Sequence, residues 1–179
     1  MICVGRRHGR ANAAKPPADR NPQNVDEPRF TPDPQLSARE VVVGHLEAFL
    51  AMDMPWDDHG VHVAYNFAMG TGGMERVRYF NGLSRDLYHL DHFLACFKSI
   101  FPELHRLGRY ELVDGEGGQA DGDTLEMRAL VWPSSADAAD QSQAVVYGFT
   151  LARNPIGRTA GCLLVAQVSR EGKAEEDGT

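Results

Sequence analysis

The sequence predicts an α+β domain in which the helices come first and an antiparallel sheet follows. Apolar residues recur at helical spacing between residues 37 and 101, which favours amphipathic helices. Between residues 107 and 168 apolar and polar residues alternate, which is typical of strands with one buried face. The chain has 179 residues, of which 42% are hydrophobic. These values suit one domain with its own core and terminal tails.

Composition and charge narrow the classes of partner. The formal net charge of -7 argues against general nucleic-acid binding, which needs a basic face. Apolar runs all fall short of the roughly 18 residues that cross a bilayer, so we expect a soluble protein without a membrane partner.

The cysteines predict neither a disulfide nor a structural zinc site. Cys3, Cys96 and Cys162 are odd in number and lack CxxC spacing, which favours a reducing, intracellular compartment. Cys96 and Cys162 lie in apolar contexts, and we expect both to be small buried residues.

The N-terminal segment, residues 1–34, is poor in large apolar residues, and we expect a disordered tail. Four basic residues precede its first acidic residue: Arg6, Arg7, Arg10 and Lys15. An acid-poor, Arg-bearing start is typical of organellar transit peptides, whereas the lack of serine before Ser37 favours a plain solvated tail. The two interpretations place the protein in a plastid or organelle stroma or in the cytosol. The domain itself is predicted over residues 35–170, with an acidic tail at 171–179.

A first helix is predicted to begin at Ser37. Ser37 and Glu40 form the S-x-x-E capping box, in which each residue satisfies a free backbone donor of the other. The helix ends at or before Pro55. Its apolar face is formed by Val42, Leu46, Phe49 and Leu50.

A second helix follows a short Pro-Trp-Asp-Asp elbow. Asp57 or Asp58 is expected to cap its N-terminus, and Gly60 weakens the helical pattern slightly. The apolar face of this helix is formed by Val61, Ala64, Tyr65 and Ala68.

Residues 70–85 are rich in glycine and predict a loop with one short strand around 77–80. A third helix is then predicted from about Leu87 to Phe101, and Pro102 ends it. Its apolar stripe consists of Leu87, Leu90, Leu94, Phe97 and Phe101.

Four strands are predicted near residues 107–113, 125–131, 145–151 and 162–168. The segments between them, at 114–123, 133–142 and 154–161, have turn compositions. Connections this short join antiparallel neighbours, so the sheet is expected to be a meander. Three helices against one face of a curved sheet of about four strands form a cone, whose open end is a natural pocket.

Three stretches together resemble a known family: EVVVGHLEAFLAMD, HGVHVAYNFA and ERVRYFNGLSRDLYHLDHF. They resemble an uncharacterised plant and algal family of unknown function in the nuclear transport factor 2-like (SnoaL-like) superfamily. The likeness covers roughly residues 31–170 and implies the same cone-shaped fold. The superfamily includes ketosteroid isomerases, polyketide cyclases, dehydratases and interaction modules, so the resemblance implies no single activity.

The isomerase pattern of that superfamily is only partly matched. Its oxyanion-binding tyrosine corresponds to His45 in the first helix. Its general-base aspartate belongs to a strand after the second helix, where residues 69–74 contain no acid. The resemblance therefore implies the fold without the proton-shuttling chemistry.

His45 is the leading candidate for a polar group in the pocket. It lies beside the apolar stripe of the first helix, where its ring could exchange a proton with a ligand. The alternative is a border histidine bonded to backbone or water. The full set of pocket candidates is His45, Tyr65, Tyr147, Phe49 and Phe97; for the two tyrosines the alternative is a core ring with a backbone partner.

Two HxxH pairs, His59 with His62 and His89 with His92, have the helical spacing at which two ligands share a face. A zinc site needs three or four ligands, which requires the two pairs to meet. Because the pairs lie in polar surroundings, solvent-facing histidines are favoured, and we expect no metal and no cofactor.

Two functional hypotheses follow. The first is a non-catalytic protein-interaction or scaffolding module that uses the outer sheet face or the cone mouth, with a homodimer through the sheet face as one form. The second is a small apolar-ligand-binding protein, or an isomerase- or cyclase-like enzyme, that uses the cone pocket.

Overall fold

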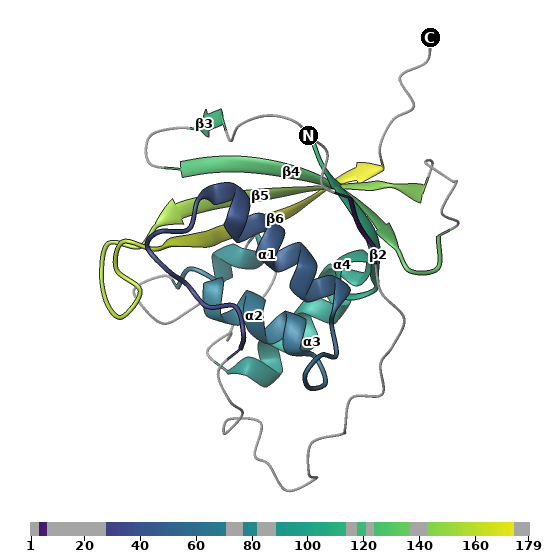
Figure 1. Ribbon diagram of the computed structural model, residues 1–179, viewed down its shortest axis with the longest axis horizontal. Helices are drawn as coiled ribbons and strands as arrows, with labels where there is room; N and C mark the ends of the chain where they lie inside the picture. The colour runs from purple at the N-terminus through teal and green to yellow at the C-terminus, as the bar shows by residue number, and fades with distance from the viewer. Residues whose placement is uncertain are drawn as a thin grey trace, which may run out of the picture.

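In the computed structural model, helices cover one face of an antiparallel sheet (Figure 1), which confirms the predicted α+β class. The structure describes residues 4–6, 28–70, 77–81, 89–113, 118–120, 124–136 and 143–173. The helical elements are α1 (Ala38–Leu50), α2 (His59–Phe67), the 3-10 helix η2 (Val77–Phe80), α3 (Leu90–Ile100) and α4 (Pro102–His105). The strands are β1 (Val4–Arg6), β2 (Leu107–Leu112), β3 (Gly118–Ala120), β4 (Thr124–Pro133), β5 (Val145–Arg153) and β6 (Leu163–Lys173).

The four predicted strands form the predicted meander, in the order β2-β4-β5-β6. The apolar residues expected on the inner face of β4 stand opposite those expected on β5. These pairs are Leu125 with Leu151, Met127 with Phe149, Ala129 with Tyr147 and Val131 with Val145. Both strands therefore turn one apolar face toward the helices, as the period-2 pattern indicates.

The sixth strand departs from the simple alternation expected for residues 162–168. Leu151 pairs with Val165 and Phe149 pairs with Val168, with a register shift between them. One extra residue in β6 moves its side chains to the opposite face. Val165 and Val168 therefore both face the helices, although an uninterrupted strand would separate them.

Two further strands lie in segments that were predicted to be irregular. β1 pairs with β2 through Gly5 and Tyr110, and β3 pairs with β4 through Gln119 and Leu125. β1 belongs to the tail that was expected to be disordered, and residues 28–34 of the same tail are also described. The rest of that tail, residues 1–3 and 7–27, lies outside the described residues.

The C-terminal segment also contains more regular structure than predicted. β6 extends through Lys173, with Gly172 opposite Val146, so the acidic tail predicted from residue 171 begins inside a strand. Residues 174–179 lie outside the described part of the chain.

The predicted capping box starts α1. The Ser37 amide donates to Glu40 Oε2 at 2.8 Å, and the Glu40 amide donates to Ser37 Oγ at 3.3 Å. One face of α1 then packs against the sheet, with Val42, Leu46 and Phe49 fully buried. The residues predicted for the apolar stripe are therefore the ones that join α1 to the core.

At the start of α2, the carboxylate of Asp58 binds basic side chains instead of capping the helix. Asp58 occupies the N-cap position with φ 59° and makes no capping bond. Its carboxylate instead accepts from Lys98 at 2.8 Å and lies 3.3 Å from Nε2 of His105. The predicted cap residue is correct in position, but its carboxylate links the elbow to α3 and α4.

Gly60, one residue into α2, has a packing role. A Cβ at this position would lie 2.5 Å from the carbonyl oxygen of Ala48, and its amide donates to the Met52 carbonyl at 3.0 Å. Glycine therefore permits α1 and α2 to approach closely, which compensates for its low helix propensity.

The strand predicted around residues 77–80 is the 3-10 helix η2. Tyr79 and Phe80 are both fully buried, and their rings lie 5.2 and 4.9 Å from the ring of Phe93. A strand would point these adjacent side chains to opposite faces, whereas the 3-10 turn buries both. α3 is described from Leu90, and Pro102 begins α4 directly after it.

Phe30 anchors the arm of residues 28–34 to the helices. Its ring stacks on Phe67 with centroids 4.8 Å apart and meets His45 edge-on at 6.4 Å. A Cβ on Gly44 would overlap the Phe30 ring. The arm therefore crosses α1 at the one residue whose lack of a side chain leaves room for the ring.

Gly44→Ala is expected to destabilise the protein by about 1–3 kcal/mol through overpacking against Phe30. In a Phe30→Ala background the same change should be neutral, or stabilising by up to ~1 kcal/mol, because alanine favours a helix more than glycine. Urea unfolding of the four proteins in this double-mutant cycle measures the coupling. Equal effects of Gly44→Ala in both backgrounds would contradict the contact.

Candidate functional site

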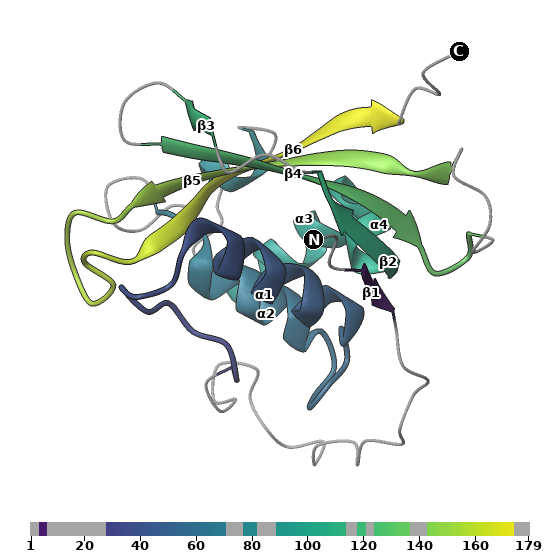
Figure 2. The ribbon, with the colours of Figure 1, turned by 45° about the horizontal axis from the view of Figure 1, so that its top comes forward.

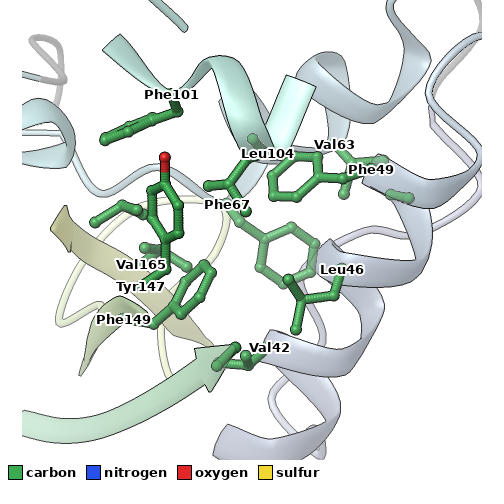
Figure 3. Close-up of a cluster of buried hydrophobic side chains, with 14 of the residues drawn as sticks. Val42, Leu46, Phe49, Val63, Phe67, Phe101, Leu104, Tyr147, Phe149 and Val165 are labelled. Carbon is green, nitrogen blue, oxygen red and sulfur yellow. The ribbon is translucent and has the colours of Figure 1, made fainter. Parts of the chain in front are cut away.

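Buried aromatic and aliphatic side chains, Phe49, Phe101 and Tyr147 among them, pack between the helices and the sheet (Figure 3). Ring centroids are 6.1 Å apart for His45 and Phe49, 5.1 Å for Phe49 and Phe97, 5.6 Å for Phe97 and Phe101, and 5.8 Å for Phe101 and Tyr147. Four of the five predicted pocket residues therefore lie along one continuous row. The space that they share is occupied by their own rings and by aliphatic neighbours.

Tyr65, the fifth candidate, joins this row from α2. Its ring meets Phe93 edge-on at 5.4 Å, and Phe93 lies 6.4 Å from Phe97. Tyr65 is half-buried, whereas the other four candidates are fully buried. The sequence thus selected residues that lie together, from three helices and one strand.

His45 is held as a neutral ring in this interior. Its Nδ1 donates to the Val41 carbonyl at 2.7 Å, since a carbonyl only accepts. Burial lowers the pKa of His45 to about 4, while the bond to Val41 acts in the opposite direction. The Nε2 atom is buried and has no hydrogen-bond partner among the described residues. The bond to Val41 agrees with the alternative of a histidine bonded to backbone, and a role for His45 toward a ligand stays a prediction.

Tyr147 reaches a carboxylate at the edge of the row. Its hydroxyl donates to Glu103 Oε2 at 2.7 Å, and Arg170 donates to Glu103 Oε1 at 2.9 Å. Burial disfavours the charged form of Glu103, but the bonds from Arg170 and Tyr147 outweigh it and leave the Glu103 pKa lowered. Burial and the adjacent carboxylate raise the pKa of Tyr147. The hydroxyl is therefore a fixed donor to a charged partner.

Sequence reasoning missed Glu103 and Arg170. Arg170 stands opposite Tyr147 in the sheet, so extending the alternation of β6 two residues past Val168 points to it. Glu103 follows Pro102 in α4 and gives no comparable signal. Its position against β5 and β6 depends on how the helix layer sits on the sheet.

The two HxxH pairs occupy separate settings. His59 accepts from the Arg29 amide at 3.4 Å, and its ring meets Trp56 at 4.7 Å. Burial, followed by the charges of His62 and Arg29, lowers the pKa of His59 to about 4. The described residues contain no group of three or more metal-binding side chains.

Within the described residues, neither Cys96 nor Cys162 takes part in a disulfide. Cys162 is buried as expected, whereas Cys96 is only half-buried because it lies at the edge of the α3 stripe. Burial raises the pKa of the Cys162 thiol, and the Asp33 carboxylate adds to this effect. A raised pKa leaves less of the reactive thiolate, so neither burial nor Asp33 activates Cys162 as a nucleophile.

A cavity of about 550 Å³ lies apart from the aromatic row. Its walls come from the arm before α1, the end of α2 and the loop between β5 and β6. The five residues predicted to line a pocket do not take part in it. The lining residues with polar side chains are Thr31, Asn66, Asn154, Arg158 and Thr159, and neither composition nor periodicity marked them.

Comparison with family models, curated proteins and solved structures finds no match to this chain. Throughout the described ranges, every helix is too short or too polar to span a membrane. The class that the fold defines is α+β, with helices packed against an antiparallel sheet whose four long strands follow them.

The His45 environment predicts an acid-dependent loss of stability. The ordinary pKa is 6.5 and the folded value is about 4, so the unfolded chain binds this proton more readily between these values. Stability should therefore fall as pH drops from 6.5 toward 4, by about 3 kcal/mol for this group. His45→Phe should remove that part of the loss, as measured by urea unfolding at pH 7 and pH 4.

The matched control is Phe49→Leu, which should lower stability by a similar amount at both pH values. An acid loss of the same size in wild type and His45→Phe would contradict the neutral, buried state of His45.

Tyr147→Phe is expected to cost about 1–3 kcal/mol, because a largely buried carboxylate loses a donor. Tyr110→Phe is the matched control, since the Tyr110 hydroxyl donates to Glu47 at 2.6 Å but Glu47 is exposed. Water can replace that donor, so the expected cost is under ~1 kcal/mol. Thermal or urea unfolding compares the two, and equal costs would contradict a special role for Glu103.

Proposed function

We propose that this chain is a non-catalytic interaction module of the nuclear transport factor 2-like type that pairs with a second copy through the outer face of its sheet. The observation that carries the proposal is the filled interior. Phe49, Phe97 and Tyr147 are fully buried, and a module whose interior serves as core has its surfaces left for function.

The polar groups of the interior support the same reading. An enzyme needs an acid or base that can reach a substrate. His45 is fully buried and bonded to Val41, and the Tyr147 hydroxyl is bonded to Glu103. The alternative of a ligand or isomerase-like site in the interior has less support, because both groups are enclosed by rings.

The outer sheet face is the surface that we propose for pairing. Residues that alternate with the inner-face positions lie on the outer face. There Glu126 stands opposite Thr150 and Arg128 opposite Gly148, and Thr150 stands opposite Gln167. Figure 2 shows the helices gathered on the other face of the sheet. Thr150 and Gly148 are small residues on β5, so the middle of this face permits close approach.

Charge on this face favours a second copy as the partner. Arg128 pairs with Glu171 at 3.1 Å, and Glu126 lies two residues along the same strand. A surface that carries both signs can be complementary to itself across a two-fold axis. The architecture agrees with the resemblance to a superfamily that contains interaction modules.

Thr150→Lys should weaken the proposed dimer at least tenfold, because it places a long charged side chain at the centre of the outer face. Light scattering after gel filtration, over a wide concentration range, measures the mass. Ser99→Lys, an equivalent change at an exposed position on α3, is the matched control and should remain dimeric. A wild-type protein that is monomeric at all concentrations would sink the proposal.

A further inference from the structure

Three segments that are distant in the sequence surround the cavity of about 550 Å³. They are the arm at Thr31 and Pro32, residues 66–70 at the end of α2, and the loop between β5 and β6. Figure 2 shows the arm running beside that loop. The volume lies within the roughly 300–1,000 Å³ of small-molecule sites. Because the residues of the aromatic row take no part in its lining, the cavity is a separate site.

The loop wall of the cavity is held by its own hydrogen bonds. Asn154 Nδ2 donates to Thr159 Oγ1 at 2.7 Å, and the Gly161 amide donates to the Asn154 carbonyl at 2.8 Å. Arg153 Nη1 donates to the Gly161 carbonyl at 2.7 Å. Gly161 has a φ of 82°, a conformation that favours glycine. The loop is therefore arranged before any ligand arrives.

The wall at the end of α2 is tied to the sheet. The Met69 amide donates to the Val165 carbonyl at 2.9 Å, and Ala68 forms a bridge with the same strand residue. The end of α2 thus has a defined position relative to β6. Both walls are set by hydrogen bonds within the protein, which favours a preformed cavity.

The polar groups that the cavity offers to a ligand are uncharged. Arg158 is the charged residue of the lining, and it already takes part in another interaction. Among the described residues that line the cavity there is no aspartate or glutamate. Burial of a charged ligand group without a partner is costly, so a neutral ligand fits this lining better than a charged one.

Asn66 supplies both a donor and an acceptor to the cavity. It lies in the last turn of α2 and is half-buried, and within the described part of the chain its side chain has no hydrogen-bond partner. A carboxamide has one carbonyl acceptor and two N–H donors. An amide group of a ligand has the same two kinds of group, so the two amides can pair through two hydrogen bonds side by side.

The loop wall adds further donors of the same uncharged kind. Thr159 Oγ1 accepts from Asn154, which leaves the hydroxyl hydrogen of Thr159 to donate. Ile156 and Gly157 are exposed, and neither amide donates to a backbone carbonyl of another described residue. The second lone pair of a ligand carbonyl can therefore be bound from the loop.

The apolar part of the lining is exposed at one residue in particular. Ile156 is 64% exposed, compared with 42% for Val113 and 38% for Met54, the other exposed large apolar residues among those described. Met69 and Leu164 also line the cavity. An aliphatic group that covers Ile156 removes this surface from water, which favours binding.

We propose that this cavity binds a small neutral amide with an aliphatic chain. The ligand carbonyl accepts from Nδ2 of Asn66, and a ligand N–H donates to Oδ1 of the same side chain. The aliphatic chain covers Ile156 and extends toward Met69 and Leu164. Such a ligand matches both kinds of surface that the cavity offers, and the inference is independent of the proposed dimer.

Titration of the full-length, ¹⁵N-labelled protein with hexanamide tests the proposal by NMR. Saturable shifts are expected at the Asn66 side-chain amide and at the backbone amides of residues 156–159. Asn66→Ala and Ile156→Asp should each weaken hexanamide binding at least tenfold. The first matched control is Asn81→Gly, which removes an exposed carboxamide at a φ of 52° that suits glycine. The second is Val113→Asp, at an exposed valine elsewhere, and both should leave the affinity unchanged.

Three further probes separate the parts of the proposal. N,N-dimethylhexanamide lacks the N–H groups, acetamide lacks the chain, and sodium hexanoate carries a charge in place of the amide. Each should bind at least tenfold more weakly than hexanamide. Equal binding of the dimethyl amide would overturn the paired bonds with Asn66, equal binding of acetamide would overturn the role of Ile156, and equal binding of hexanoate would overturn the neutral class of ligand. Hexanamide shifts that fail to saturate, or that map to the aromatic row instead, would overturn the site itself.

Discussion

The packing of aromatic rings between the helix layer and the sheet constrains the rest of the molecule. His45, Phe49, Phe97, Phe101 and Tyr147 form one row from α1 to β5. Rings of this size occupy the volume that an open cone would leave for a ligand. Every polar atom beside them must find a local partner or remain neutral, because water is excluded.

The two ends of the row show how this requirement is met. At one end the His45 ring stays uncharged and bonds to the carbonyl one turn earlier in α1. At the other end the Tyr147 hydroxyl leaves the apolar space and meets Glu103, which Arg170 also holds. That second contact joins α4 to β5 and β6. The Glu103 carboxylate is 17% exposed and its Arg170 partner is 44% exposed, so the acid of this pair is more shielded from water than the base.

Local patterns predicted much of the architecture because they act over a few residues. The capping box at Ser37 and the alternation in β4 and β5 depend on helix and strand geometry alone. The same reasoning failed in the N-terminal arm, where average composition suggested disorder. The Phe30 ring packs over Gly44 and on Phe67, and the average composition of a segment does not predict one such contact. The aromatic pocket candidates were found by their helical and strand periods, but the polar partners Glu103 and Arg170 were not.

By itself, the sequence determined the three main helices, the four main strands, the apolar faces of α1, β4 and β5, and that His45 lies beside the apolar face of its helix. These properties follow from side-chain period and from residues within one or two turns of each other. Only the tertiary structure decided the extra residue in β6 and the ion pair between Asp58 and Lys98. It also decided that the arm, α2 and the β5–β6 loop meet around a cavity. Each of these depends on groups that are distant in the chain, and only the packed backbone brings such groups within bonding distance.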